Sequence, residues 1–125
     1  MLFKFYLNAI ILPMTVKEFV IERKAKLAEE ISTFSKKPHL VIIQANDNPA
    51  SDAYIRGKMK DAGEIGADAT LLKFDPSITE EALLKEIRRC NEDDSVTGLI
   101  VQLPLPKHIS EAKVKLAVSP EKDVD

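Results

Sequence analysis

Residues 39–58, HLVIIQANDNPASDAYIRGK, contain a complete strand–turn–helix unit. The continuous apolar run at residues 40–43 is rich in β-branched side chains, which is typical of a strand covered on both faces. Residues 46–49 (NDNP) have the composition of a turn. Ser51 can then cap a helix for which Gly66 is the expected stop.

The same alternation extends in both directions along the chain. Upstream, Thr15 and Glu18 have the spacing of a capping box and open a helix that should end before Pro38. Downstream, we expect strands at residues 69–74 and 98–103 (GLIVQL), a helix capped by Ser77 or Thr79 that runs through Cys90, and a short helix opened by Ser110.

Strands that alternate with helices through short joints indicate a mainly parallel sheet built from right-handed crossovers. We therefore predict a single domain of the three-layer α/β/α class, with helices on both faces of the sheet. Its expected bounds are residues 15–125. Residues 1–14 are expected to be an extension or a buried N-terminal strand, because the apolar run at residues 7–12 is too short for a membrane span and no cleavage site follows it.

Composition excludes several classes of function. The 125 residues are 45% hydrophobic and 30% charged, with a formal net charge of −2. No basic excess is present to bind nucleic acid. One cysteine cannot form an internal disulfide, and the two histidines do not have metal-site spacing with it. We expect a cytoplasmic protein with neither a metal nor a membrane or nucleic-acid partner.

Ligands of open parallel sheets bind beyond the carboxyl ends of the strands. Ser51, Tyr54 and Lys58 would share one face of the helix that begins there. A lysine in a partly dry cleft can act as an acid or a base. The alternative is a surface lysine beside a half-buried tyrosine, and spacing does not decide between the two.

A second polar group should lie at the same edge. Gln102 ends an apolar strand, so its amide must be satisfied either by a neighbouring loop or by a ligand or partner side chain. Pro104 and Pro106 fix an extended path suited to a rigid cleft wall. The four glycines do not form a GxGxxG motif or a P-loop, so no dinucleotide or phosphate cradle is visible.

Three motifs, taken together, resemble one known family. They are NPASDAYIRGK at residues 48–58, GLIVQLPLPKHI at 98–109 and PEKDVD at 120–125. In content, order and spacing they are similar to the methylenetetrahydrofolate dehydrogenase/cyclohydrolase family. The resemblance implies a tetrahydrofolate-binding catalytic domain that oxidises 5,10-methylene-tetrahydrofolate to the methenyl form with NADP and hydrolyses that product to 10-formyl-tetrahydrofolate.

The resemblance also implies roles for single residues. Lys58 would be the catalytic acid/base, Gln102 would hydrogen-bond it, and Tyr54 would stack on the p-aminobenzoyl ring. Asp125 would accept hydrogen bonds from the pterin. Ser51 would contact substrate, and Val101, Leu103 and Pro104 would line the same cleft.

The chain departs from the family pattern in two ways. Ala45-Asn46 stands where the family commonly has Val-Gly, and the family's NADP-binding Rossmann domain has no counterpart in these residues. We therefore expect NADP to be bound by a missing domain of a longer, homodimeric parent enzyme. Two alternatives stay open: a non-catalytic folate-binding remnant, and a small α/β interaction module.

Overall fold

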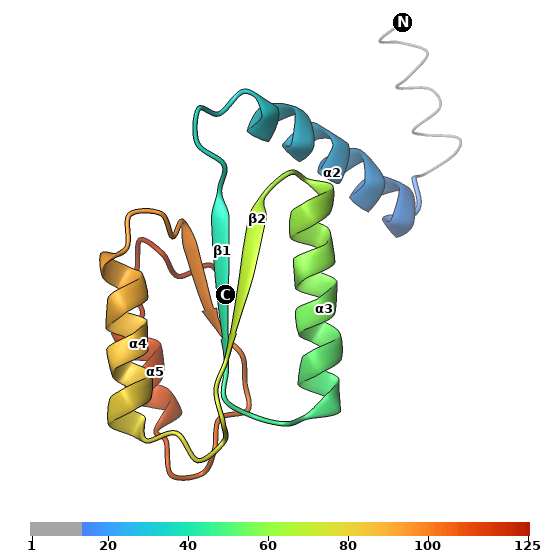
Figure 1. Ribbon diagram of the computed structural model, residues 1–125. Coiled ribbons are helices and arrows are strands. Elements are labelled where there is room, and N and C mark those ends of the chain that lie inside the picture. The colour runs from blue at the N-terminus through green and yellow to red at the C-terminus, as the bar shows by residue number, and fades with distance from the viewer. Residues whose placement is uncertain (1–13) are drawn as a thin grey trace, which may run out of the picture.

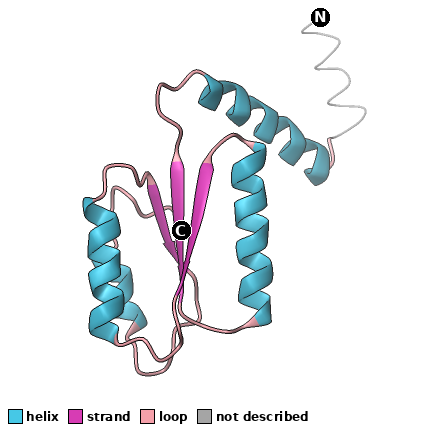
Figure 2. Ribbon diagram, in the orientation of Figure 1, coloured by secondary structure: helices cyan, strands magenta, loops and turns pink. Residues whose placement is uncertain are grey.

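The computed structural model describes residues 14–125; the expected N-terminal extension or strand lies almost entirely outside this range. Three strands form one sheet in the order β2-β1-β3, and both pairings are parallel. Helix α3 covers one face of the sheet, and α4 and α5 cover the other (Figures 1 and 2). The predicted three-layer α/β/α class is confirmed.

The central strand is β1 (His39–Gln44), which pairs with β2 (Asp68–Lys73) and with β3 (Gly98–Val101). Its last four residues are buried, as expected for a strand covered on both faces. The third strand is two residues shorter than predicted. It ends at Val101 because Gln102 is the last residue whose backbone N–H bonds to β1, on the Ile43 carbonyl, and Pro104 has no N–H to give.

The core lies on both sides of the sheet and is unequally divided. The larger cluster packs α4 and α5 against β1 and β3, with Leu83, Ile87 and Leu99 fully buried at its centre. The smaller cluster joins Ile42 and Ile100 to Ile55 of α3. Cys90 belongs to the larger cluster and is 1% exposed.

Helix α3 (Pro49–Glu64) begins three residues earlier than expected. The prediction that Ser51 caps it is wrong: the cap is Asn48, whose side chain accepts a hydrogen bond from the Ala50 N–H, and Pro49 suits the first helical position. The predicted stop is correct. Gly66 has φ of +81°, a conformation that glycine adopts without steric cost.

The remaining helices begin at the predicted caps. Thr79 caps α4 (Glu80–Glu92), and Ser110 caps α5 (Glu111–Ala117). Thr15 and Glu18 form the predicted capping box of α2 (Val16–Ser32). Within residues 14–125, no helix combines the length and the apolar character needed to cross a membrane.

Helix α2 contacts the rest of the described chain differently from the others. It has no buried residue, and Phe19 remains 55% exposed. Its tie to α3 is polar: the Lys24 ammonium lies 2.6 Å from both the Asp61 and the Glu64 carboxylates. The apolar side chains of α2 therefore remain largely uncovered by the rest of the described chain.

Candidate functional site

Lys58, in the second half of α3, contacts Gln102, which directly follows the carboxyl end of β3. The Lys58 ammonium Nζ donates a hydrogen bond of 2.9 Å to Gln102 Oε1. Lys58 lies on α3 and is half-buried, whereas Gln102 is only 9% exposed. Two residues that are 44 positions apart in sequence thus form a direct pair.

The orientation of the Gln102 amide is set by a second bond. Its Nε2 donates to the Leu103 carbonyl oxygen at 3.0 Å, so Oε1 is the atom left to face Lys58. An ammonium group can only donate, and it therefore requires an acceptor at this position. Both options foreseen for Gln102 are realised at once, since the amide bonds a loop carbonyl and a partner side chain.

Ser51 and Tyr54, which were expected to face the substrate with Lys58, differ sharply in exposure. Ser51 is 2% exposed, and its hydroxyl donates to the Leu103 carbonyl at 3.2 Å. It therefore lies beneath the loop that follows β3. Tyr54 is 64% exposed, one turn of helix from Lys58, so its ring is free to stack on a planar ligand.

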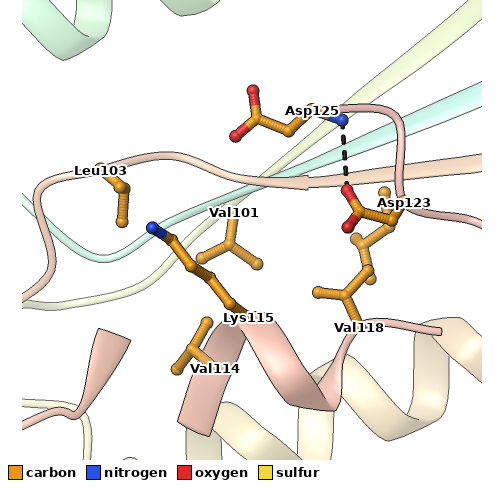
Figure 3. A pocket seen from close by; sticks show the side chains of 8 residues that line it. Val101, Leu103, Val114, Lys115, Val118, Asp123 and Asp125 are labelled. Atoms are coloured by element: carbon orange, nitrogen blue, oxygen red, sulfur yellow. Dashed lines mark hydrogen bonds between the residues drawn. The ribbon is translucent and has the colours of Figure 1, made fainter. Parts of the chain in front are cut away.

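A pocket of about 260 Å³ lies between β3 and α5 (Figure 3). Val101 and Leu103 form one wall, and Asp125 stands at the rim, where its backbone N–H donates to Asp123 Oδ1 at 3.2 Å. Figure 3 shows the Lys115 side chain extending toward Leu103. The pocket thus combines an apolar wall with a carboxylate and an ammonium group.

The two parts of the candidate site are joined through Leu103. Its carbonyl oxygen accepts from Ser51 and Gln102 on the α3 side, whereas its side chain lines the pocket beside α5. Among the residues that the structure describes, no hydrogen bond or ion pair links Asp125 directly to Lys58. The predicted residues therefore flank the carboxyl end of β3 on its two sides.

Asp125 is held in place by the residues just before it. The Lys122 ammonium donates to two carbonyls at the end of α4, those of Cys90 at 3.0 Å and Asp93 at 2.7 Å. The Lys122 carbonyl accepts from the Leu99 N–H at 2.7 Å, which ties this segment to the outer edge of β3. Lys122 thus fixes the end of the PEKDVD motif beside β3, where Asp123 forms an isolated parallel bridge with Leu99.

Sequence reasoning missed three polar residues beside the site. Gln44 and Asn46 are 1% and 9% exposed, and Gln44 Nε2 donates to Asp52 Oδ1 at 2.7 Å. This hydrogen bond is the main reason why the pKa of Asp52 lies below its ordinary value, and the nearby positive charges of Lys73 and Arg56 act in the same direction against the opposing effect of partial burial. Gln44 is the last residue of β1 and Gln102 directly follows β3, so the reasoning applied to Gln102 would also have identified Gln44.

Residues 14–125 contain no cluster of three or more histidine, cysteine, aspartate or glutamate side chains suited to a metal ion. Both histidines bond within the protein, His39 to the Thr70 hydroxyl and His108 to the Ile78 carbonyl.

Comparison with protein families gives one match that covers most of the chain. The model of the tetrahydrofolate dehydrogenase/cyclohydrolase catalytic domain matches residues 14–125. The bifunctional protein FolD of Bacillus cytotoxicus is 44% identical over 111 residues, which is 86% of this chain and 39% of that protein. The protein of the same name from Flavobacterium johnsoniae is 46% identical over 106 residues, 82% of this chain and 36% of that protein.

Solved structures give the same result. A 5,10-methylenetetrahydrofolate dehydrogenase from the silkworm Bombyx mori superposes with a TM-score of 0.82 at 41% identity, covering 86% of this chain and 38% of that one. The bifunctional FolD enzyme of Campylobacter jejuni superposes with a TM-score of 0.82 at 34% identity, covering 86% and 39%. The chain thus spans about two fifths of the length of these relatives. It belongs to the tetrahydrofolate dehydrogenase/cyclohydrolase family and corresponds to its catalytic domain.

Proposed function

We propose that this chain is the tetrahydrofolate-binding catalytic domain of a bifunctional one-carbon enzyme. The parent enzyme would oxidise 5,10-methylene-tetrahydrofolate to the methenyl form and hydrolyse that form to 10-formyl-tetrahydrofolate. The observation that carries the proposal is the Lys58–Gln102 pair, 2.9 Å apart, at the carboxyl edge of the sheet. Family membership over residues 14–125 supports it.

The hydrolytic step needs a group that can both take and return a proton. Water attacks the methenyl carbon between N5 and N10, and Lys58, as the free amine, would take the proton that this water loses. The resulting ammonium would return the proton to N5 as the bond from N5 to the carbon breaks. The hydroxyl on the carbon would lose its own proton to solvent as the formyl carbonyl forms on N10. Gln102 Oε1 would hold the ammonium between the two transfers.

Binding would use groups on both sides of β3. The exposed Tyr54 ring would stack on the p-aminobenzoyl ring. The pterin would enter the pocket beside Val101 and Leu103, where the Asp125 carboxylate can accept hydrogen bonds from the aminopyrimidine edge. Pro104 would complete the wall. Ser51 would support the loop from below.

Hydride transfer would require NADP, the cofactor named for the FolD structure of Trypanosoma brucei. When bound to the parent enzyme, NADP would supply the acceptor for the hydride of the methylene carbon. The residues of this chain do not fit it, because the glycines at 57, 63, 66 and 98 form no phosphate-binding loop. The nucleotide site, like the homodimeric state and cytoplasmic location of the parent enzyme, is proposed from the family alone.

The test is hydrolysis of 5,10-methenyl-tetrahydrofolate by the purified chain, which is monitored as a decrease in the absorbance of the methenyl form. Lys58→Arg keeps the positive charge but cannot release a proton at working pH, so hydrolysis should stop while tetrahydrofolate still binds. Lys60→Arg is the matched control, because Lys60 lies on the same helix with its side chain 76% exposed. Equal rates for Lys58→Arg and the control would refute the acid/base role. Binding without hydrolysis by the unmutated chain would favour a non-catalytic folate-binding remnant.

A further inference from the structure

A chain of buried amide groups runs beneath the loop that carries Gln102, and its centre is Asn46. This residue lies in the turn between β1 and α3 and is 9% exposed. Its Nδ2 donates to the Pro104 carbonyl at 2.8 Å and to Ser51 Oγ at 3.3 Å. One side chain thus bonds both the loop after β3 and the first turn of α3.

The direction in which the Asn46 amide points is fixed by its other neighbours. Its Oδ1 accepts from Gln44 Nε2 at 3.1 Å and from the Asn48 N–H at 3.0 Å. Gln44 is oriented in turn by the Asp52 carboxylate, to which its Nε2 donates at 2.7 Å. With both donors at its oxygen, Asn46 must present its NH₂ group to Ser51 and Pro104.

The orientation of the Asn46 amide also determines the hydrogen bonds around the Lys58–Gln102 pair. Because Ser51 Oγ accepts from Asn46, its single proton is directed to the Leu103 carbonyl. The same carbonyl receives Gln102 Nε2, which leaves Gln102 Oε1 to face Lys58. The carbonyls of residues 103 and 104, which belong to two successive peptide bonds, therefore both accept hydrogen bonds from the side chains beneath the loop.

We propose that Asn46 is a positioning residue for the reaction: its carboxamide fixes the loop at residues 102–104 so that the Gln102 oxygen points at Lys58. Asn46 does not touch the substrate in this arrangement. The catalytic consequence rests on the proposed function, but the structural consequence, the orientation of the Gln102 amide, can be measured without any substrate.

Asn46→Asp is the sharpest test, because aspartate has the same shape and keeps the acceptor oxygen but cannot donate to Pro104 or Ser51. Asn46→Ala removes the whole group. Thr79→Ala is the matched control, since it removes one side-chain hydrogen bond at the start of α4, away from the site. Circular dichroism verifies that each variant is folded.

The first readout is the Gln102 side-chain amide in the ¹H–¹⁵N spectrum of the labelled chain. We expect its resonances to move in both Asn46 variants and to stay unchanged in Thr79→Ala. The second readout is methenyl-tetrahydrofolate hydrolysis, where misplacement of a supporting group by about 1 Å lowers kcat by up to roughly 100-fold. The loss should fall on kcat and leave KM within about twofold, as expected for a group that does not bind substrate.

An unmoved Gln102 amide in the folded variants overturns the proposal, whatever the activity. If Gln102 moves but neither binding nor hydrolysis is found in the unmutated chain, the positioning inference stands and the proposed function fails. If both variants fail to fold, the proposal is tested on the unmutated chain by the exchange rates of its side-chain amide protons. The Asn46 NH₂ protons must then exchange with solvent more slowly than those of Asn48, whose side chain uses its oxygen for the helix cap, and equal rates contradict the proposal.

Discussion

Gly98→Ala should weaken tetrahydrofolate binding while changing the free energy of unfolding only slightly. A Cβ added at Gly98 would lie 3.1 Å from both γ-methyl carbons of Val124 and 3.6 Å from Leu40 Cδ1. Carbon atoms pack best at about 3.5–4.0 Å, so Val124 must retreat by about 0.5 Å, whereas Leu40 need not move. Because Val124 is 55% exposed, it can yield to solvent, and the free energy of unfolding should change by less than about 1 kcal/mol.

The effect on binding should be larger because Asp125 follows Val124 directly. A hydrogen bond to a charged group contributes about 1.5–3 kcal/mol, and its complete loss would weaken binding about 10- to 150-fold. A shift of half an ångström lengthens the bonds without removing them, so we expect the lower end, about tenfold. Titration calorimetry with tetrahydrofolate measures the affinity, and thermal unfolding of the same samples measures the stability.

A second substitution verifies the cause. Val124→Ala removes both methyl groups that the new Cβ would meet, so the double variant Gly98→Ala/Val124→Ala should recover the affinity of Val124→Ala alone. If Gly98→Ala binds as tightly as the unmutated chain, Asp125 does not contact the ligand. If the double variant stays as weak as Gly98→Ala, the loss does not arise from the crowding of Val124.

Two further predictions concern stability and reactivity. The Glu80 carboxylate accepts a hydrogen bond from the Ser110 N–H at 2.8 Å and pairs with the Lys113 ammonium at 2.9 Å. These contacts, the Ser110 bond first, lower the pKa of Glu80 in the folded chain. The contribution of Glu80 to stability should therefore be present above its unfolded-state pKa of about 4.3 and disappear as the pH falls through its lower folded-state pKa. In urea unfolding, the unmutated chain should have a higher free energy of unfolding than Glu80→Gln at pH 7, and this difference should narrow below about pH 4. A difference that does not depend on pH would contradict the prediction. Burial raises the pKa of the Cys90 thiol, so alkylation should proceed only as fast as the chain opens; labelling at the rate of a free thiol in the native protein would show that Cys90 is accessible.

The sequence predicted the layers of the fold more accurately than the ends of its elements. Residues 40–43 and 98–101 are apolar on both sides of the pleat, and such a run is stable only between two layers of helices. The end of β3 and the cap of α3 depend on competition among neighbours. Asn48 occupies the capping position because Pro49 starts the helix, and Ser51 is drawn beneath the loop at Leu103.

The polar part of the site was predictable only in pieces. Gln102 stands out because it ends an apolar strand, and Lys58 because of its helix spacing and the family motif. Their contact depends on how far α3 lies from β3, which no local pattern encodes. Asn46 reads as a turn residue in the sequence. Three of its four hydrogen bonds are to residues 44, 48 and 51, and only the bond to the Pro104 carbonyl requires the loop at 102–104 to fold over it.

The exposed apolar side chains of α2 mark another limit of sequence patterns. Phe19 and Leu27 recur at the interval of a buried helix face, yet they are 55% and 40% exposed in the described chain. Periodicity reports that a face is apolar, and it carries no information about which surface covers that face.

Binding of tetrahydrofolate across the carboxyl end of β3 can be followed by titrating the ¹⁵N-labelled chain with tetrahydrofolate and recording the amide resonances of the chain. Saturable shifts should appear at Val101, Leu103 and Asp125 and at the Gln102 side-chain amide, while the outer face of α4, at Lys85 and Arg88, should not change. Shifts that never saturate, or that cluster on α4 and leave the residues around β3 unmoved, would contradict the assignment of the site.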